Sequence, residues 1–177
     1  MKVNLNDNRY IEILVDEQQN IVIFPISKSE VTEKNSDGTV GEYEYHCAYF
    51  PIELKWQYTK EQLAEKIEFG LGEWNKHKCY ERFDGKNTLE EKYFGIKGFQ
   101  NAVRGKKQLY LGWNNIEGKF VSLSLPVKRG YAYYGIKNIL LNEKADWIDY
   151  AETVLKLLDL DLSKECAFRS FKKQLNI

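Results

Sequence analysis

Residues 51–71 read PIELKWQYTKEQLAEKIEFGL, and the same pattern returns 87 positions later in residues 138–158, which read NILLNEKADWIDYAETVLKLL. Each copy has two alternating apolar residues, a short polar spacer, an N-cap residue and an apolar series at helical spacing. The matching positions are those that build a strand and dock a helix on it. We therefore expect two similar strand–helix units, near 45–75 and 132–162.

Helix starts are marked by N-cap residues. Thr59 with Gln62, and Thr88 with Glu91, have the capping-box spacing, and Asp146 takes the place of Thr59 in the second copy. Apolar spacing predicts which residues the two repeated helices bury: Leu63, Ile67, Leu71 and Trp74 in the first, and Ile148, Ala151, Leu155 and Leu158 in the second.

Alternating apolar residues predict strands elsewhere in the chain. Residues 10–15 and 21–25 form one expected hairpin, and residues 109–113 and 121–125 form another, around a polar turn. Tyr131–Tyr134 and Ile139–Leu141 add strand material, and Ser163 is expected to cap a last helix that buries Phe168, Phe171 and Leu175. The sequence thus predicts one α+β domain over residues 1–177, with a mostly antiparallel sheet and helices packed on it.

The composition of the chain indicates which kinds of partner and which cellular compartment to expect. Lysine plus arginine and aspartate plus glutamate each number 26, so no global field favours nucleic acid or anionic lipid. The longest apolar run is too short to span a bilayer, and the N-terminus has no apolar signal-peptide region. Three widely spaced cysteines suggest reduced thiols. We therefore expect a cytoplasmic protein with no membrane partner.

The two histidines, His46 and His77, raise the question of an enzyme. A histidine pair can serve as acid and base in RNA cleavage, but each also has a structural interpretation, on a strand and at a helix C-terminus. Their neighbours Cys47 and Cys79 offer metal ligands of the right type, but adjacent strand residues point to opposite faces. We expect no enzyme activity, no metal and no cofactor.

Residues 92–115 combine basic and aromatic side chains without an acid. Lys106 and Lys107 belong to this segment, together with Lys92, Lys97 and Arg104. Such a pattern can hold single-stranded nucleic acid through phosphate pairing and base stacking. A small RNA-binding or RNA-cleaving protein that uses this segment with the two histidines is therefore the alternative hypothesis, although a solvated basic face explains the same residues.

Residues 142–165 have the opposite charge: seven acids and three lysines give a net charge of −4. Asp146, Asp149 and Glu152 fall on the helix face opposite the expected apolar stripe, with Glu143 just before it. Such a face is usually only solvated, but it can also dock a basic partner. Nearby aromatic residues are candidate interface anchors, because buried tyrosines often dominate binding energy; they are Tyr131, Tyr133 and Tyr134.

The order of elements resembles that of immunity proteins from bacterial contact-dependent growth inhibition systems. Three segments carry the resemblance: residues 51–64, residues 92–125 and the stretch from Ile139 into the helix at Asp146. The family pattern often has Leu-Gly where this chain has Leu63-Ala64 and Tyr150-Ala151.

The resemblance implies a cytoplasmic, non-catalytic protein that binds a cognate toxin, commonly a nuclease, and blocks its active site or substrate access. It implies no direct contact with nucleic acid. Because a nuclease cleft is basic, the acidic side of the molecule is the expected contact region: Glu143, Asp146, Asp149 and Glu152, with Tyr131, Tyr133 and Tyr134.

Overall fold

The computed structural model describes residues 8–28, 33–34, 40–41, 44–46, 51–74, 76, 88–126 and 133–165. Its strands are β1 (Arg9–Val15), β2 (Ile21–Lys28), β3 (Glu33–Lys34), β4 (Val40–Gly41), β5 (Glu44–His46), β6 (Ile52–Leu54), β7 (Lys107–Asn114), β8 (Gly118–Pro126) and β9 (Tyr133–Leu140). Its helices are α1 (Lys60–Gly72), α2 (Leu89–Phe94), α3 (Phe99–Ala102) and α4 (Trp147–Leu158), followed by the 3-10 turn η1 (Leu162–Lys164).

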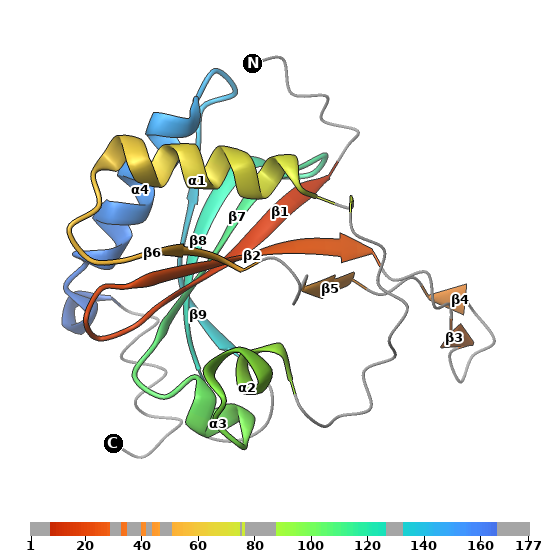
Figure 1. The fold of residues 1–177 in the computed structure, drawn as a ribbon. Coiled ribbons are helices and arrows are strands. Elements are labelled where there is room, and N and C mark those ends of the chain that lie inside the picture. Colours follow the sequence, from red (N-terminus) through yellow and green to blue (C-terminus); the bar gives the residue numbers. More distant parts are fainter. Residues whose placement is uncertain are drawn as a thin grey trace.

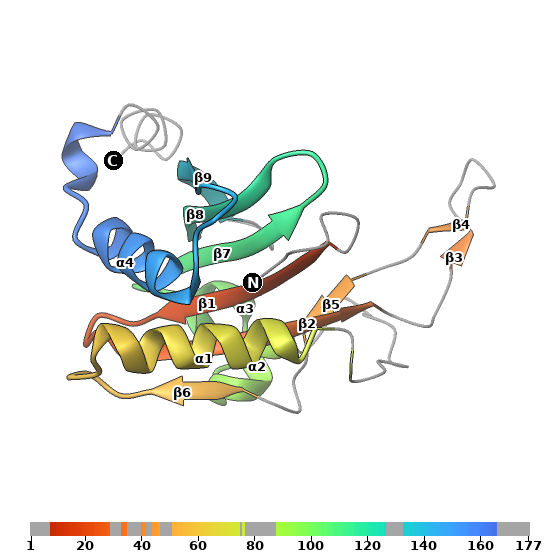
Figure 2. The same ribbon diagram turned by 90° about the horizontal axis from the view of Figure 1, so that it is seen from above.

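Seven strands form one sheet in the order β5-β2-β1-β7-β8-β9, with β6 also paired to β2. Every pairing in this sheet is antiparallel. Helices α1 and α4 lie side by side on one face (Figure 1), and α2 and α3 lie on the other face (Figure 2). The predicted α+β class, a mostly antiparallel sheet with helices packed on it, is confirmed.

Local cap chemistry explains where the helices begin. The Thr59 hydroxyl accepts a hydrogen bond from the Gln62 N–H, and the Gln62 side chain accepts one from the Thr59 N–H. Thr88 and Glu91 repeat this capping box at α2, which ends at Gly95 in a left-handed conformation. Asp146 caps α4, 87 residues after Thr59. The helix starts predicted at Thr59, Thr88 and Asp146 are confirmed. The cap predicted at Ser163 is wrong, because Ser163 lies inside the 3-10 turn η1, whose N-cap is Asp161. The similarity of the two complete strand–helix units stays a prediction.

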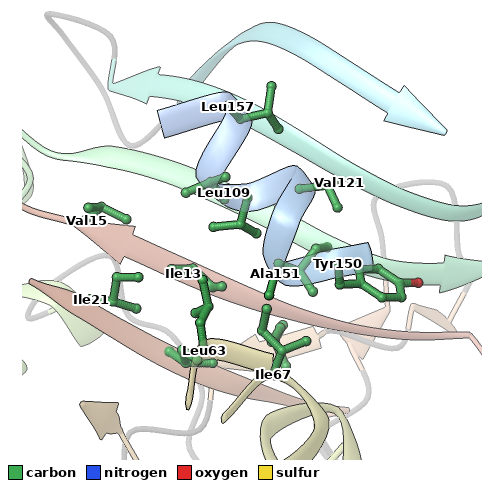
Figure 3. Close-up of a cluster of buried hydrophobic side chains, with 14 of the residues drawn as sticks. Ile13, Val15, Ile21, Leu63, Ile67, Leu109, Val121, Tyr150, Ala151 and Leu157 are labelled. Carbon is green, nitrogen blue, oxygen red and sulfur yellow. The ribbon is translucent and has the colours of Figure 1, made fainter. Parts of the chain in front are cut away.

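The main core lies between the sheet and the α1–α4 layer. The predicted stripe is buried, as expected: Leu63, Ile67 and Leu71 lie on α1, and Trp74 follows just after its end. In Figure 3, Ala151 of α4 lies next to Ile67 of α1, while Leu157 lies at the other end of the same cluster.

The stripe predicted for α4 was partly wrong. Ala151 and Leu158 are buried, but Ile148 and Leu155 are only partly buried, while the fully buried positions include Tyr150, Val154 and Leu157. The physical reason is that α4 contacts both the sheet and α1, so its buried arc is wider than a single stripe and is turned toward α1.

A second, smaller core lies on the opposite face of the sheet. Leu14, Val22 and Phe24 point to this side and are covered by Leu89, Tyr93 and Phe94 of α2. The predicted helix of Phe168, Phe171 and Leu175 lies outside the described residues.

Candidate partner-binding surface

The predicted acidic residues surround the start of α4. Glu143, Asp146 and Asp149 are exposed and Glu152 is half-exposed. They come from the connection between β9 and α4 and from the first two turns of the helix. Glu143, Asp146 and Asp149 therefore lie around the start of α4, and Glu152 lies near its middle.

Two of these acids also stabilise the helix. One oxygen of Asp146, Oδ1, accepts hydrogen bonds from the N–H groups of Ile148 and Asp149, at 2.9 and 3.1 Å. In return, Asp149 Oδ2 accepts a 2.8 Å hydrogen bond from the Asp146 N–H. Replacing either residue would therefore disturb the helix start as well as any partner contact.

A buried lysine lies beneath this end of the helix. Lys119, at the start of β8, is only 3% exposed, and its ammonium group donates a hydrogen bond to the Ala145 carbonyl. Burial lowers the pKa of Lys119, while the nearby carboxylates of Asp149, Asp146 and Glu143 oppose that shift. Three of the four predicted contact acids thus help to balance an internal cation. Sequence reasoning missed Lys119, because a single lysine in a strand gives no signal of burial.

Glu152 lies farther along α4 and pairs with Lys156 at 3.1 Å. A hydrogen bond from Lys156, the charge of Lys156 and the charge of Lys60 together lower the pKa of Glu152. Lys60 begins α1, so the Glu152 carboxylate lies within electrostatic reach of the start of that helix. A shallow depression of about 350 Å³ runs beside it, lined by Asn142, Asp149 and Thr153 among others.

Acidic residues continue from α4 onto α1. Glu61, Glu65 and Glu68 are exposed on the outer side of α1, and Lys66 pairs loosely with Glu65 at 3.9 Å. We use the name acidic helical surface for the exposed and half-exposed acids of both helices and of the α4 start: Glu61, Glu65, Glu68, Glu143, Asp146, Asp149 and Glu152. The contribution of α1 was missed, although the repeat itself pairs Glu65 with Glu152.

The predicted tyrosines are not gathered with these acids as far as the structure describes them. Tyr134 is partly buried and packs against the main core. Tyr133 belongs to β9 by its backbone, but its side chain, and all of Tyr131, lie outside the described part of the chain. Their role as interface anchors stays a prediction.

The alternative hypothesis depends on the basic–aromatic segment, residues 92–115. Two lysines of this segment make contacts within the protein. Lys106 donates to the Ala102 carbonyl at 2.6 Å, with its ammonium 4.2 Å from the centre of the Phe94 ring. Lys107 donates to the Leu158 carbonyl at 2.6 Å. Burial lowers the pKa of both lysines. These two ammonium groups therefore already bind backbone carbonyl groups of the protein itself.

The other candidate groups are only partly described. His46 lies in β5 by its backbone, and its side chain, like Cys47, His77 and Cys79, falls outside the described residues. Within the described ranges, no group of three histidine, cysteine or carboxylate side chains could hold a metal ion. In the same ranges, no helix is both long and apolar enough to cross a membrane.

Comparisons with known proteins bear on the fold alone. No family model matches the chain, and no curated protein sequence matches it. Among solved structures, the fold is similar to that of a protein of unknown function from Neisseria meningitidis, with a TM-score of 0.52 and 12% sequence identity. The alignment covers 89% of this chain and 96% of that chain, so the likeness extends over nearly the whole fold of both.

Proposed function

We propose that this chain is a cytoplasmic immunity protein that binds a cognate secreted toxin, a nuclease, and blocks its active site or its access to substrate. In this proposal the protein performs no catalysis of its own. The supporting observation is the acidic helical surface: two helices that contact each other on one face of the sheet both carry exposed or half-exposed carboxylates. A nuclease cleft that holds a polyphosphate chain is basic, and an acidic surface is complementary to it.

The rigidity of the layer is what makes such a surface useful. Helices α1 and α4 share one core, and each starts at a fully formed capping box. Carboxylates on packed helices keep their positions when a partner binds, so little ordering entropy opposes association. Charges of this kind mainly speed the encounter and set its orientation.

The two helix faces are too small to form the whole interface with a partner. Helices of 13 and 12 residues are about 18–20 Å long, and packed helices lie about 10 Å apart. A standard interface buries about 800 Å² on each partner, more than two such helix faces provide. In this proposal the toxin therefore also covers loops at one or both ends of α1 and α4.

The test starts from the gene neighbourhood, because toxin and immunity proteins are encoded together. The C-terminal domain of the protein encoded immediately upstream should be purified and titrated with this chain, and both should be produced together in cells. A tight one-to-one complex and protection of the cells support the proposal. If this chain neither binds the toxin domain nor protects the cells, the proposal is wrong.

A further inference from the structure

Strand β9 lies at one edge of the seven-stranded sheet. Just after it, the Leu141 N–H donates a 2.8 Å hydrogen bond to the Lys119 carbonyl on β8. Because residues of an antiparallel strand alternate in the direction of their backbone groups, those of Ile139 face β8, whereas those of Asn138 and Leu140 face outward. In the described part of the chain, no strand pairs with this outer side. It is a row of N–H and C=O groups that can pair with another strand.

The end of β9 lacks the features that usually protect an edge strand, which are charged residues, prolines and bulges. The bulge of β9 falls at Ile136, before this end. Residues 138–141 read Asn-Ile-Leu-Leu and contain no charge and no proline. Leu140 is 60% exposed, and Ile139 and Leu141 beside it are only partly buried. An apolar edge of this kind favours pairing with another strand.

Both faces of the sheet leave space beside this edge. On the face that carries α4, the depression of about 350 Å³ beside that helix is also lined by Leu141 and Asn142. On the other face, a depression of about 560 Å³ is lined by Lys137 and Asn138, together with residues of β1, β7 and β8. The side chains of an added strand can therefore be accommodated on both faces.

The sequence of this edge is complementary to itself when two copies run antiparallel. Residues 137–143 read Lys-Asn-Ile-Leu-Leu-Asn-Glu. When two copies are aligned about Leu140, every position faces a residue of matching chemistry: Leu140 faces Leu140, Ile139 faces Leu141, Asn138 faces Asn142, and Lys137 faces Glu143. This register also places the outward-facing backbone groups of the two Leu140 residues directly opposite each other. Shifting one copy by two residues in either direction sets Leu140 opposite an asparagine, so the pattern selects one register.

The charged residues at the ends of this pattern can reach each other between two copies. Glu143 is exposed and begins the turn after the strand, so its contact with Lys137 would be made by the two long side chains. Lys137 already pairs with Glu165 at 3.1 Å, but an ammonium group has three donors and can bind a second carboxylate. Exposed pairs add little energy, and their main effect here is to favour the antiparallel direction.

We propose that a second copy of this chain pairs with the outer side of β9 around a twofold axis at Leu140, so that the two sheets form one continuous antiparallel sheet. The occupant is a second copy because the edge matches its own reversed sequence at every position. Seven residues on each side form less than the standard interface of about 800 Å² per partner, so we expect a weak dimer with a dissociation constant of about 10–100 µM. The inference goes beyond the proposed function, because this dimer contains no toxin.

Sedimentation velocity of the purified chain from about 5 to about 500 µM measures the dimer. Leu140→Lys places two like charges opposite each other at the axis and should weaken dimerisation at least about tenfold. Because Leu140 is exposed, this variant should fold, and circular dichroism checks this. The matched control is Ile116→Lys, which makes the same kind of change at a 90% exposed residue of the β7–β8 turn and should leave the dimer unchanged.

A charge exchange tests the register. Glu143→Lys sets a lysine opposite Lys137 and should weaken the dimer about two- to fivefold. Adding Lys137→Glu to this variant restores opposite charges between the two copies and should recover the lost affinity. A double variant that dimerises no better than Glu143→Lys would show that the two residues do not face each other, and the proposal would fail.

Hydrogen exchange followed by NMR gives an independent measurement at single residues. In the monomer the Ile139 N–H faces β8 and should exchange slowly, whereas the Leu140 N–H should exchange fast. In the dimer the Leu140 N–H should become protected. A chain that stays monomeric at all these concentrations, a dimer that Leu140→Lys leaves intact, or a Leu140 N–H whose exchange does not depend on concentration would overturn the proposal. None of these results bears on toxin binding, which is measured separately.

Discussion

The ammonium group of Lys119 on β8 donates a hydrogen bond to the carbonyl of Ala145, the residue before the N-cap of α4. The backbone of Lys119 also accepts a 2.8 Å hydrogen bond from the Leu141 N–H. One residue thus ties both ends of the connection between β9 and α4 to the sheet. This connection carries Glu143 and leads to Asp146, so the tie positions part of the acidic helical surface.

Replacing Lys119 by methionine should destabilise the protein. The substitution leaves the Ala145 carbonyl without its donor and the nearby carboxylates without their cation, and we expect a loss of about 1–3 kcal/mol in the free energy of unfolding. Urea unfolding followed by circular dichroism measures this loss. The matched control is Lys144→Met, an exposed lysine two residues before the cap, which should change stability by less than about 0.5 kcal/mol. Equal stabilities of the two variants would contradict the role given to Lys119.

The buried hydroxyl of Tyr150 should make the protein sensitive to alkali. This hydroxyl donates a 2.6 Å hydrogen bond to the Gly112 carbonyl, and burial raises its pKa above the ordinary value of 10.0. Because the unfolded chain loses this proton first, the stabilising contribution is complete below pH 10.0 and is lost as the pH rises above it.

Tyr150→Phe should therefore cost about 1–2 kcal/mol at neutral pH and reduce the fall of stability above about pH 10. Unfolding curves at several pH values measure both effects. An unchanged alkaline slope in the variant would show that other groups, such as Tyr93, cause it.

The cost of truncating an apolar side chain on α1 or α4 should follow how deeply that side chain is buried. Ile67 is fully buried between α1 and the sheet, and Ile67→Ala should cost about 2–5 kcal/mol. On α4, Leu157→Ala should fall in the same range, whereas Leu155→Ala should cost less, because Leu155 is only partly buried. A larger loss for Leu155→Ala than for Leu157→Ala would contradict the orientation of α4.

These cases also show what the sequence can and cannot predict. The caps Thr59, Thr88 and Asp146 depend on three or four neighbouring residues, so local patterns located the helix starts correctly. The buried arc of α4 depends on α1, which is distant in sequence, and the helical period alone assigned Leu155 to the core instead of Leu157. The burial of Lys119 and the exposure of Leu140 are likewise tertiary properties, and no spacing of residue types reveals them.

The alternative hypothesis of an RNA-cleaving protein makes an opposite prediction about turnover. We expect no cleavage when the purified protein is incubated with RNA at low and high salt. We also expect His46→Ala together with His77→Ala to leave toxin binding intact. RNA cleavage that disappears in the double variant would favour a nuclease over a binding protein.

The most direct measurement of the central claim is the association rate of this chain with the upstream-encoded toxin domain after charge reversal on the acidic helical surface. The structure guides the choice of variant: Glu65, Glu143 and Glu152 can be changed to lysine without touching the capping pair Asp146 and Asp149. The control is Glu117→Lys, an exposed acid on the β7–β8 turn.

Steering by exposed charges predicts that the triple variant associates about tenfold more slowly at about 0.02 M salt and much less so at about 0.5 M, where the charges are screened. The control should differ little from the wild type at either concentration. Association of the triple variant at the wild-type rate in both salts would contradict the claim that this surface receives the toxin.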